Sequence, residues 1–140
     1  MNYDFKDLKK QISDSVSEHD SNQTLDGFLY NTFVIAAILC STVASLFIDK
    51  FALAAKILTL SAAALVAIDR ALNWGARWIY HRNMRHEYLL ILARINLIEN
   101  SESHLSEEEK KKYFLLIFDD LFTLRRKESL IPGVTDVKGK

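Results

Sequence analysis

Cysteine, proline and glycine are all scarce in this chain of 140 residues. It has one cysteine, Cys40, together with one proline and four glycines. A single cysteine excludes an intrachain disulfide and any zinc or iron–sulfur site built from several cysteines. So little proline and glycine leaves few turns for a many-stranded β fold. The sequence therefore predicts an all-α fold.

Net charge is also absent, because 18 Lys and Arg residues balance 18 Asp and Glu residues. This balance excludes a strongly basic nucleic-acid-binding protein and an acidic disordered tail. The charges are unevenly distributed, however. Residues 27–68 contain only three charged side chains, those of Asp49, Lys50 and Lys56. A charge-poor stretch of that length is typical of helices embedded in a membrane.

Two apolar runs fill this stretch. The first, residues 27–48, has 22 residues and no charge, and about 20 helical residues span a hydrocarbon core of about 30 Å. The second, residues 51–68, is interrupted only by Lys56, whose long stem can extend towards the headgroups. We expect a two-helix transmembrane hairpin over residues 27–75, its second helix continuing unbroken into residues 71–80. A soluble bundle with two buried helices is the alternative.

The positions of Lys and Arg predict the orientation of these spans. Four arginines follow the second span, whereas the connection between the spans offers Lys50, with Lys56 just inside the second run. Positive residues favour the cytoplasmic side, so both termini are expected there. The first run is not typical of a cleaved signal peptide, because 26 residues rich in Asp and Ser precede it without an adjacent basic region.

The flanking segments have helical patterns of their own. Residues 1–26 are expected to form an N-terminal cytoplasmic segment, with an amphipathic helix at 3–16 and a polar linker at 17–26. Residues 76–133 are expected to form a cytoplasmic helical hairpin. Its second helix begins at the capping-box pattern Ser106 to Glu109 and is stopped by Pro132-Gly133. Residues 134–140 are expected to be a flexible tail.

Small residues recur at every fourth position of the second span. Such spacing allows helix backbones to approach closely in lipid, which predicts a packing seam within the hairpin or between subunits. The seam residues are Ala55, Thr59, Ala63, Ala67, Ala71 and Gly75.

Polar residues form a stripe along the first span and are candidates to line a pore. Hydrogen bonding between helices is an equally good interpretation. One hairpin cannot enclose water, so a pore would require a homo-oligomer. The candidate pore-lining residues are Asn31, Ser41, Thr42, Ser45 and Asp49.

Basic and aromatic residues alternate after the second span. They suit contact with the anionic headgroups of a lipid bilayer, or binding of a phosphate-bearing messenger or partner, although no glycine-rich phosphate loop accompanies them. This face comprises Arg70, Trp74, Arg77, Trp78, His81 and Arg85. No catalytic triad, metal-ligand cluster or cofactor motif is evident, so we expect neither an enzyme nor a cofactor, and no nucleic-acid partner.

The order of these features resembles a known family. Two closely spaced spans are followed by Asn73-Trp74 and then by ARWIYHRNMRHEYLLILARI. This order is similar to the SLATT family, the SMODS and SLOG-associating two-transmembrane effector domain. Within the segment, Ala76, His81-Arg82 and Tyr88 with the following Leu89 and Leu92 look like the family pattern. The C-terminal RRKESLIPGV also resembles the close of the family, so the likeness covers roughly residues 27–135.

The resemblance implies a non-enzymatic, oligomeric effector of the prokaryotic inner membrane, which forms pores or disrupts the membrane in antiviral conflict systems. It also implies a nucleotide-messenger synthase or sensor protein as partner. A membrane-anchored adaptor or immunity-type protein, whose cytoplasmic helices bind a partner, is the main alternative. A soluble helical binding module and a soluble enzyme follow in that order.

Overall fold

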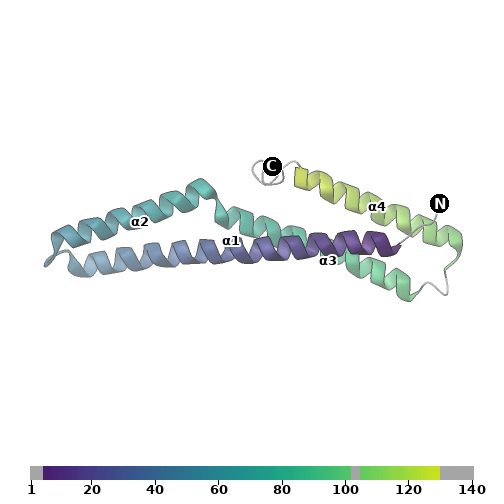
Figure 1. Cartoon of the computed structure of the whole chain (residues 1–140), viewed down its shortest axis with the longest axis horizontal. Coiled ribbons are helices and arrows are strands. Elements are labelled where there is room, and N and C mark those ends of the chain that lie inside the picture. Colours follow the sequence, from purple (N-terminus) through teal and green to yellow (C-terminus); the bar gives the residue numbers. More distant parts are fainter. Residues whose placement is uncertain (1–4, 102–104, 130–140) are drawn as a thin grey trace. The chain divides into compact units, whose positions relative to one another are not determined.

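The computed structural model describes residues 5–101 and 105–129 (Figure 1). Within these residues the chain forms four helices and no strand: α1 (Phe5–Phe47), α2 (Ala52–Leu72), α3 (Trp74–Asn100) and α4 (Glu107–Ser129). The all-α prediction is therefore confirmed. The predicted stop at Pro132-Gly133 and the tail at 134–140 lie outside the described residues. The described residues divide into two compact units: unit 1 comprises residues 5–20, 82–101 and 105–129, and unit 2 is Ser21–His81.

Helix α1 is continuous over 43 residues, so the polar linker predicted at 17–26 is wrong. Those ten residues contain no proline or glycine that would end a helix. Two of them, His19 and Asp26, are buried. The inward side of α1 continues through this polar stretch at alternating spacings of three and four residues, the pattern of helices packed as in a coiled coil. The buried and half-buried positions include Leu8, Ile12, Ser15, His19, Asn22, Asp26, Phe33, Ala37, Cys40 and Ala44.

Unit 1 is built from the start of α1, most of α3 and α4. Helices α3 and α4 are antiparallel, since Arg94 binds Asp120 at 2.6 Å and Lys127 lies 3.9 Å from Glu87. Helix α1 runs parallel to α4: Phe5 contacts Phe114, and His19 contacts Glu128. The residues expected as a helix pair thus pack with a third segment. The apolar core consists of Leu8, Ile12, Met84, Tyr88, Ile91, Ile95, Ile117, Leu121 and Leu124.

The start of α4 has the capping box expected from the sequence. The amide of Glu109 donates to Oγ of Ser106 at 3.3 Å, and the amide and hydroxyl of Ser106 donate to Oε2 of Glu109 at 2.9 and 2.8 Å. These bonds satisfy donors that a helix N-terminus otherwise leaves unpaired. Because they favour the charged carboxylate, the backbone bond from Ser106 above all, they hold the pKa of Glu109 below its ordinary value.

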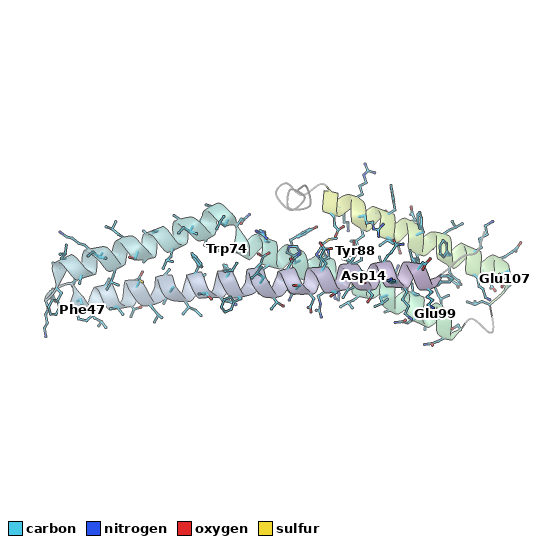
Figure 2. The ribbon with its side chains drawn as sticks, in the orientation of Figure 1. Asp14, Phe47, Trp74, Tyr88, Glu99 and Glu107 are labelled. Carbon is cyan, nitrogen blue, oxygen red and sulfur yellow. The ribbon has the colours of Figure 1, made fainter. Side chains whose placement is uncertain are left out.

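Unit 2 contains the remainder of α1, the whole of α2 and the first residues of α3. A short turn at 48–51 follows Phe47, which is labelled in Figure 2, and leads into α2. Alanines seven residues apart are buried on each helix, Ala37 and Ala44 on α1 and Ala55 and Ala62 on α2. Small side chains at these positions allow the two backbones to approach closely.

The second predicted helix does not continue through residue 73. Asn73 adopts the left-handed conformation, with φ 53° and ψ 36°, and separates α2 from α3. Its amide donates to the carbonyl oxygen of Asp69 at 2.7 Å, which closes the last turn of α2. Asparagine tolerates this conformation better than most residues. The expected unbroken helix is therefore wrong, and α3 begins immediately afterwards at Trp74 (Figure 2).

Candidate functional site

The candidate site in unit 2 is centred on Asp26, the last charged residue before the long apolar run of α1. Asp26 is 1% exposed. Its Oδ1 lies 3.3 Å from Nη2 of Arg77, and its Oδ2 lies 3.6 Å from Nε2 of the buried His81. Burying a carboxylate is costly unless a partner compensates its charge. Arg77 supplies this charge, and His81 adds a second polar contact between α1 and α3.

Glycines and aromatic rings interlock beside these polar contacts. A Cβ added to Gly27 would lie 3.0 Å from Cδ1 and Nε1 of Trp78, and one added to Gly75 would lie 3.0 Å from Cε2 of Tyr30. Tyr30 also stacks on Trp78, with centroids 6.3 Å apart, and Phe33 contacts Trp74 at 4.6 Å. Each helix thus offers a glycine to a ring of the other, which brings α1 and α3 close together.

A groove of about 440 Å³ opens between α1 and α2 near the break at Asn73. Its walls are apolar along most of their length and polar near the end of α2. It is lined by Tyr30, Phe33, Val34, Ala37, Leu65, Val66, Asp69, Arg70, Asn73 and Gly75. The Oδ1 of Asp69 is buried and accepts no hydrogen bond within the described part of the chain.

Unit 1 has a buried polar cluster of its own. Nε2 of His19 lies 2.6 Å from Oε1 of Glu128, and the imidazole stacks on the ring of Tyr88 with centroids 5.6 Å apart. Tyr88 is fully buried. Burial, followed by the nearby negative charge of Glu128, raises the pKa of Tyr88 to about 12. The cluster links α1, α3 and α4 through polar contacts within the core.

The predicted basic face is largely paired within the chain. Arg77 and His81 contact Asp26, and in unit 1 the Nε of Arg85 lies 2.9 Å from Oδ1 of Asp20. Trp74 and Trp78 pack against rings of α1. Arg70 differs from them because it is exposed at the edge of the groove. The face is therefore in large part a contact with α1.

The candidate pore-lining residues are all exposed on the single chain. Two of their hydroxyls bond to the backbone of α1: Thr42 donates to the carbonyl oxygen of Ile38 at 2.8 Å, and Ser45 donates to that of Thr42 at 2.7 Å. These hydroxyls therefore need neither water nor a second helix to be satisfied. The exposed residues are Asn31, Ser41, Thr42, Ser45 and Asp49.

The predicted small-residue seam is only partly used within the chain. Ala55 is buried and Gly75 is half-buried, whereas Thr59, Ala63, Ala67 and Ala71 are exposed. A four-residue spacing exceeds the 3.6 residues of a helical turn, so the stripe drifts by about 40° at each step. The face of α2 that turns inward instead follows spacings of three and four, at Ala55, Leu58, Ala62, Leu65 and Asp69.

The sequence reasoning missed the α1 half of these contacts. Asp26, Gly27 and Tyr30 in unit 2, and His19 in unit 1, were assigned to the linker or to the apolar run without a role. A signal was present, because His19 and Asp26 are seven residues apart and continue the spacing of Leu8 and Ile12. Because both side chains are polar, the sequence pattern did not identify these positions as buried.

Comparison with protein-family models, with curated proteins and with solved structures gives no match to this chain. Among the residues that the structure describes, no group of three or more His, Cys, Asp or Glu side chains is arranged to hold a metal ion. The described residues of the site in unit 2 provide an ion pair, aromatic packing and an apolar groove.

Proposed function

We propose that the chain is an integral membrane protein in which residues 27–47 of α1 and helix α2 cross the bilayer as a hairpin. The observation that carries this proposal is the exposure of the apolar helices. Both are long and apolar enough to cross a membrane, and only 11% of the most apolar window of each is buried. The core helix of a soluble protein would be mostly covered. Exposed side chains include Ile35, Ile38, Leu39, Leu46, Leu53, Ile57, Leu60 and Val66.

Two further observations support embedding in lipid. The hydroxyls of Thr42, Ser45 and Thr59 are satisfied by backbone carbonyls three or four residues earlier, which lowers the cost of placing them in hydrocarbon. Aromatic residues and paired charges gather where the apolar runs meet α3, as expected at a membrane–water interface. The excess of arginine after α2 supports an orientation in which residues 5–20, 82–101 and 105–129 lie on the cytoplasmic side.

Within the membrane the protein acts as a non-enzymatic, oligomeric effector that opens a pore or disrupts the bilayer. The resemblance to the SLATT family supports this function, and implies a prokaryotic antiviral or conflict system with a nucleotide signal or partner protein as trigger. The exposed part of the small-residue seam on α2 gives neighbouring copies a surface for close helix packing. Its residues are Thr59, Ala63, Ala67 and Ala71.

The second candidate function is a membrane-anchored adaptor. It is favoured by the outer face of α4, where Leu115, Phe118 and Phe122 are each more than half exposed and are spaced three and four residues apart. Apolar side chains at that spacing are typical of a helix that binds another helix. In an adaptor, this face would bind the partner while the hairpin only holds the protein at the membrane.

Leakage from proteoliposomes separates the two functions. Alkaline carbonate extraction first establishes that the protein is integrated. The effector should release an entrapped dye, and replacing both spans with an unrelated hairpin should abolish release. An adaptor would leave the vesicles intact. It would still bind its partner after both spans have been replaced.

The small-residue seam of α2 provides a matched pair of variants for the same assay. Ala63→Leu should reduce leakage by blocking close approach between copies. Ala54→Leu adds the same volume at an exposed position on another side of α2 and should leave leakage unchanged. Equal leakage from both variants would count against assembly through this seam.

A further inference from the structure

The groove between α1 and α2 combines an apolar wall with separated opposite charges. Phe33, Val34, Leu65 and Val66 supply apolar surface, while Asp69 and Arg70 lie at its polar end beside Asn73. A volume of about 440 Å³ is within the usual range of small-molecule sites, roughly 300–1,000 Å³. In the proposed membrane orientation, the apolar part faces the hydrocarbon and the polar end lies at headgroup level. The inference below therefore rests on the proposed function.

Asp69 is the residue that points to a particular ligand. Its Oδ1 is buried and accepts no hydrogen bond within the described residues. A buried acceptor without a donor costs free energy, which a bound donor would recover. The C-terminal end of α2, where Asp69 lies, adds partial negative charge from its backbone carbonyls. The inner part of this polar end is therefore suited to a cation that carries N–H groups.

Arg70 supplies the opposite charge at the edge of the groove. Its side chain is exposed, and a guanidinium binds phosphate oxygens through two parallel N–H bonds. An inner carboxylate and an outer guanidinium match a zwitterion that has an ammonium at its tip and a phosphate behind it. The apolar wall next to them matches an acyl chain.

We propose that this groove binds a phospholipid with a primary-ammonium headgroup, such as phosphatidylethanolamine. The ammonium donates a hydrogen bond to Oδ1 of Asp69, Arg70 binds the phosphate, and an acyl chain lies against the apolar residues of α1 and α2. Phosphatidylcholine has the same phosphate and chains but no N–H group. The site therefore distinguishes the two lipids by one charged hydrogen bond.

Native mass spectrometry of the full chain in detergent micelles tests this directly. The probes are phosphatidylethanolamine, its N,N-dimethyl derivative and phosphatidylcholine, with phosphatidylglycerol as an anionic control, all with identical acyl chains. The wild-type chain should retain phosphatidylethanolamine about tenfold more tightly than phosphatidylcholine, as expected for one hydrogen bond to a charged group. The dimethyl lipid keeps one N–H and should retain most of this preference.

Three variants assign the preference to individual residues. Asp69→Asn should abolish it, because the ammonium loses its charged acceptor. Arg70→Gln should weaken the retention of all three lipids while leaving the ratio between their affinities unchanged. Because Arg70 is exposed, this variant keeps the test valid if Asp69→Asn fails to fold. Asp119→Asn, which changes an exposed aspartate of α4 outside the groove, should behave as the wild type.

Equal retention of phosphatidylethanolamine and phosphatidylcholine by the wild-type chain would overturn the proposal, as would a preference that survives in Asp69→Asn. Tighter retention of phosphatidylglycerol, which is anionic and lacks an ammonium, would also overturn it, because it would indicate simple attraction to basic residues. If the protein resists carbonate extraction, these results refute the lipid site alone. If carbonate releases the protein, the membrane function fails as well.

Discussion

At the scale of single residues, the feature that needs most explanation is the burial of His19 and Asp26 on α1. Each occupies an inward position that would usually be apolar, and each contacts polar groups of another helix. A polar residue in a helical core costs stability but fixes which helix faces it and in what register. The two residues therefore specify how α1 aligns with its neighbours in each unit.

The buried position of Asp26 gives a prediction about stability. Asp26→Ala leaves the buried His81 and the half-exposed Arg77 without their carboxylate, so it should lower the free energy of unfolding by about 2–3 kcal/mol, somewhat less than for a fully buried pair. Asp20→Ala breaks an ion pair in which Asp20 is 55% exposed and should cost less than about 1 kcal/mol. Unfolding in mixed detergent micelles measures both. Equal losses would mean that Asp26 is not specially placed.

Tyr88 gives a prediction about pH. Because burial raises its pKa to about 12 from 10, the folded protein retains this proton at pH values where the unfolded chain has lost it. The resulting stability is fully present below pH 10 and is lost as the pH rises through 12. Absorbance at 295 nm should show one tyrosine that titrates late, and Tyr88→Phe should remove that step alone. A late step that persists in Tyr88→Phe would assign it to another tyrosine.

At the scale of secondary-structure elements, the sequence predicted the helices better than their ends. The capping box at Ser106 and Glu109 could be predicted because a helix start has a local signature. The continuity of α1 could not be inferred from local preference, since residues 17–26 are rich in Ser, Asp and Asn, which favour turns. Their helical state depends on contacts with residues more than 50 positions away. Likewise, the tolerance of asparagine for the left-handed conformation did not by itself identify Asn73 as the break between α2 and α3.

The contact between α1 and α3 makes the effect of an added methyl group predictable. In an exposed helix, Gly27→Ala would stabilise by about 1 kcal/mol through helix propensity. Here the new Cβ would lie 3.0 Å from the ring of Trp78, so we expect a net destabilisation of about 1 kcal/mol. In a Trp78→Leu background, the same substitution should become neutral or stabilising. Thermal unfolding of the four proteins gives this coupling, and additive effects would contradict it.

At the scale of the whole molecule, hydropathy alone identified the apolar segments, and the exposure of α1 and α2 agrees with it. The candidate site was less accessible to sequence reasoning. The sequence singled out Trp74, Arg77 and His81 as a basic and aromatic face, but their partners Phe33 and Asp26 lie more than 40 positions earlier in the chain. A basic face read alone suggested lipid or phosphate as its partner, and only the fold showed that carboxylates of α1 occupy much of it.

The proposed orientation predicts the result of cysteine labelling. Cys40, the only native cysteine, lies in the first apolar run and should react with a membrane-impermeant maleimide only after detergent is added. In a Cys40→Ser background, Ser106→Cys should be labelled from the cytoplasmic side and Asp49→Cys from the opposite side. Labelling of both positions from one side would exclude a hairpin that crosses the bilayer.

The continuity of α1 also has a consequence for protease sensitivity. Proteases cut where the backbone can unfold locally into an extended strand, and loops or linkers usually provide such places. A linker at 17–26 would have been cut readily, separating residues 1–16 from the apolar run. Because α1 is helical from Phe5 to Phe47, that site is absent, and limited digestion of the folded protein should leave residues 5–47 as one uncut fragment.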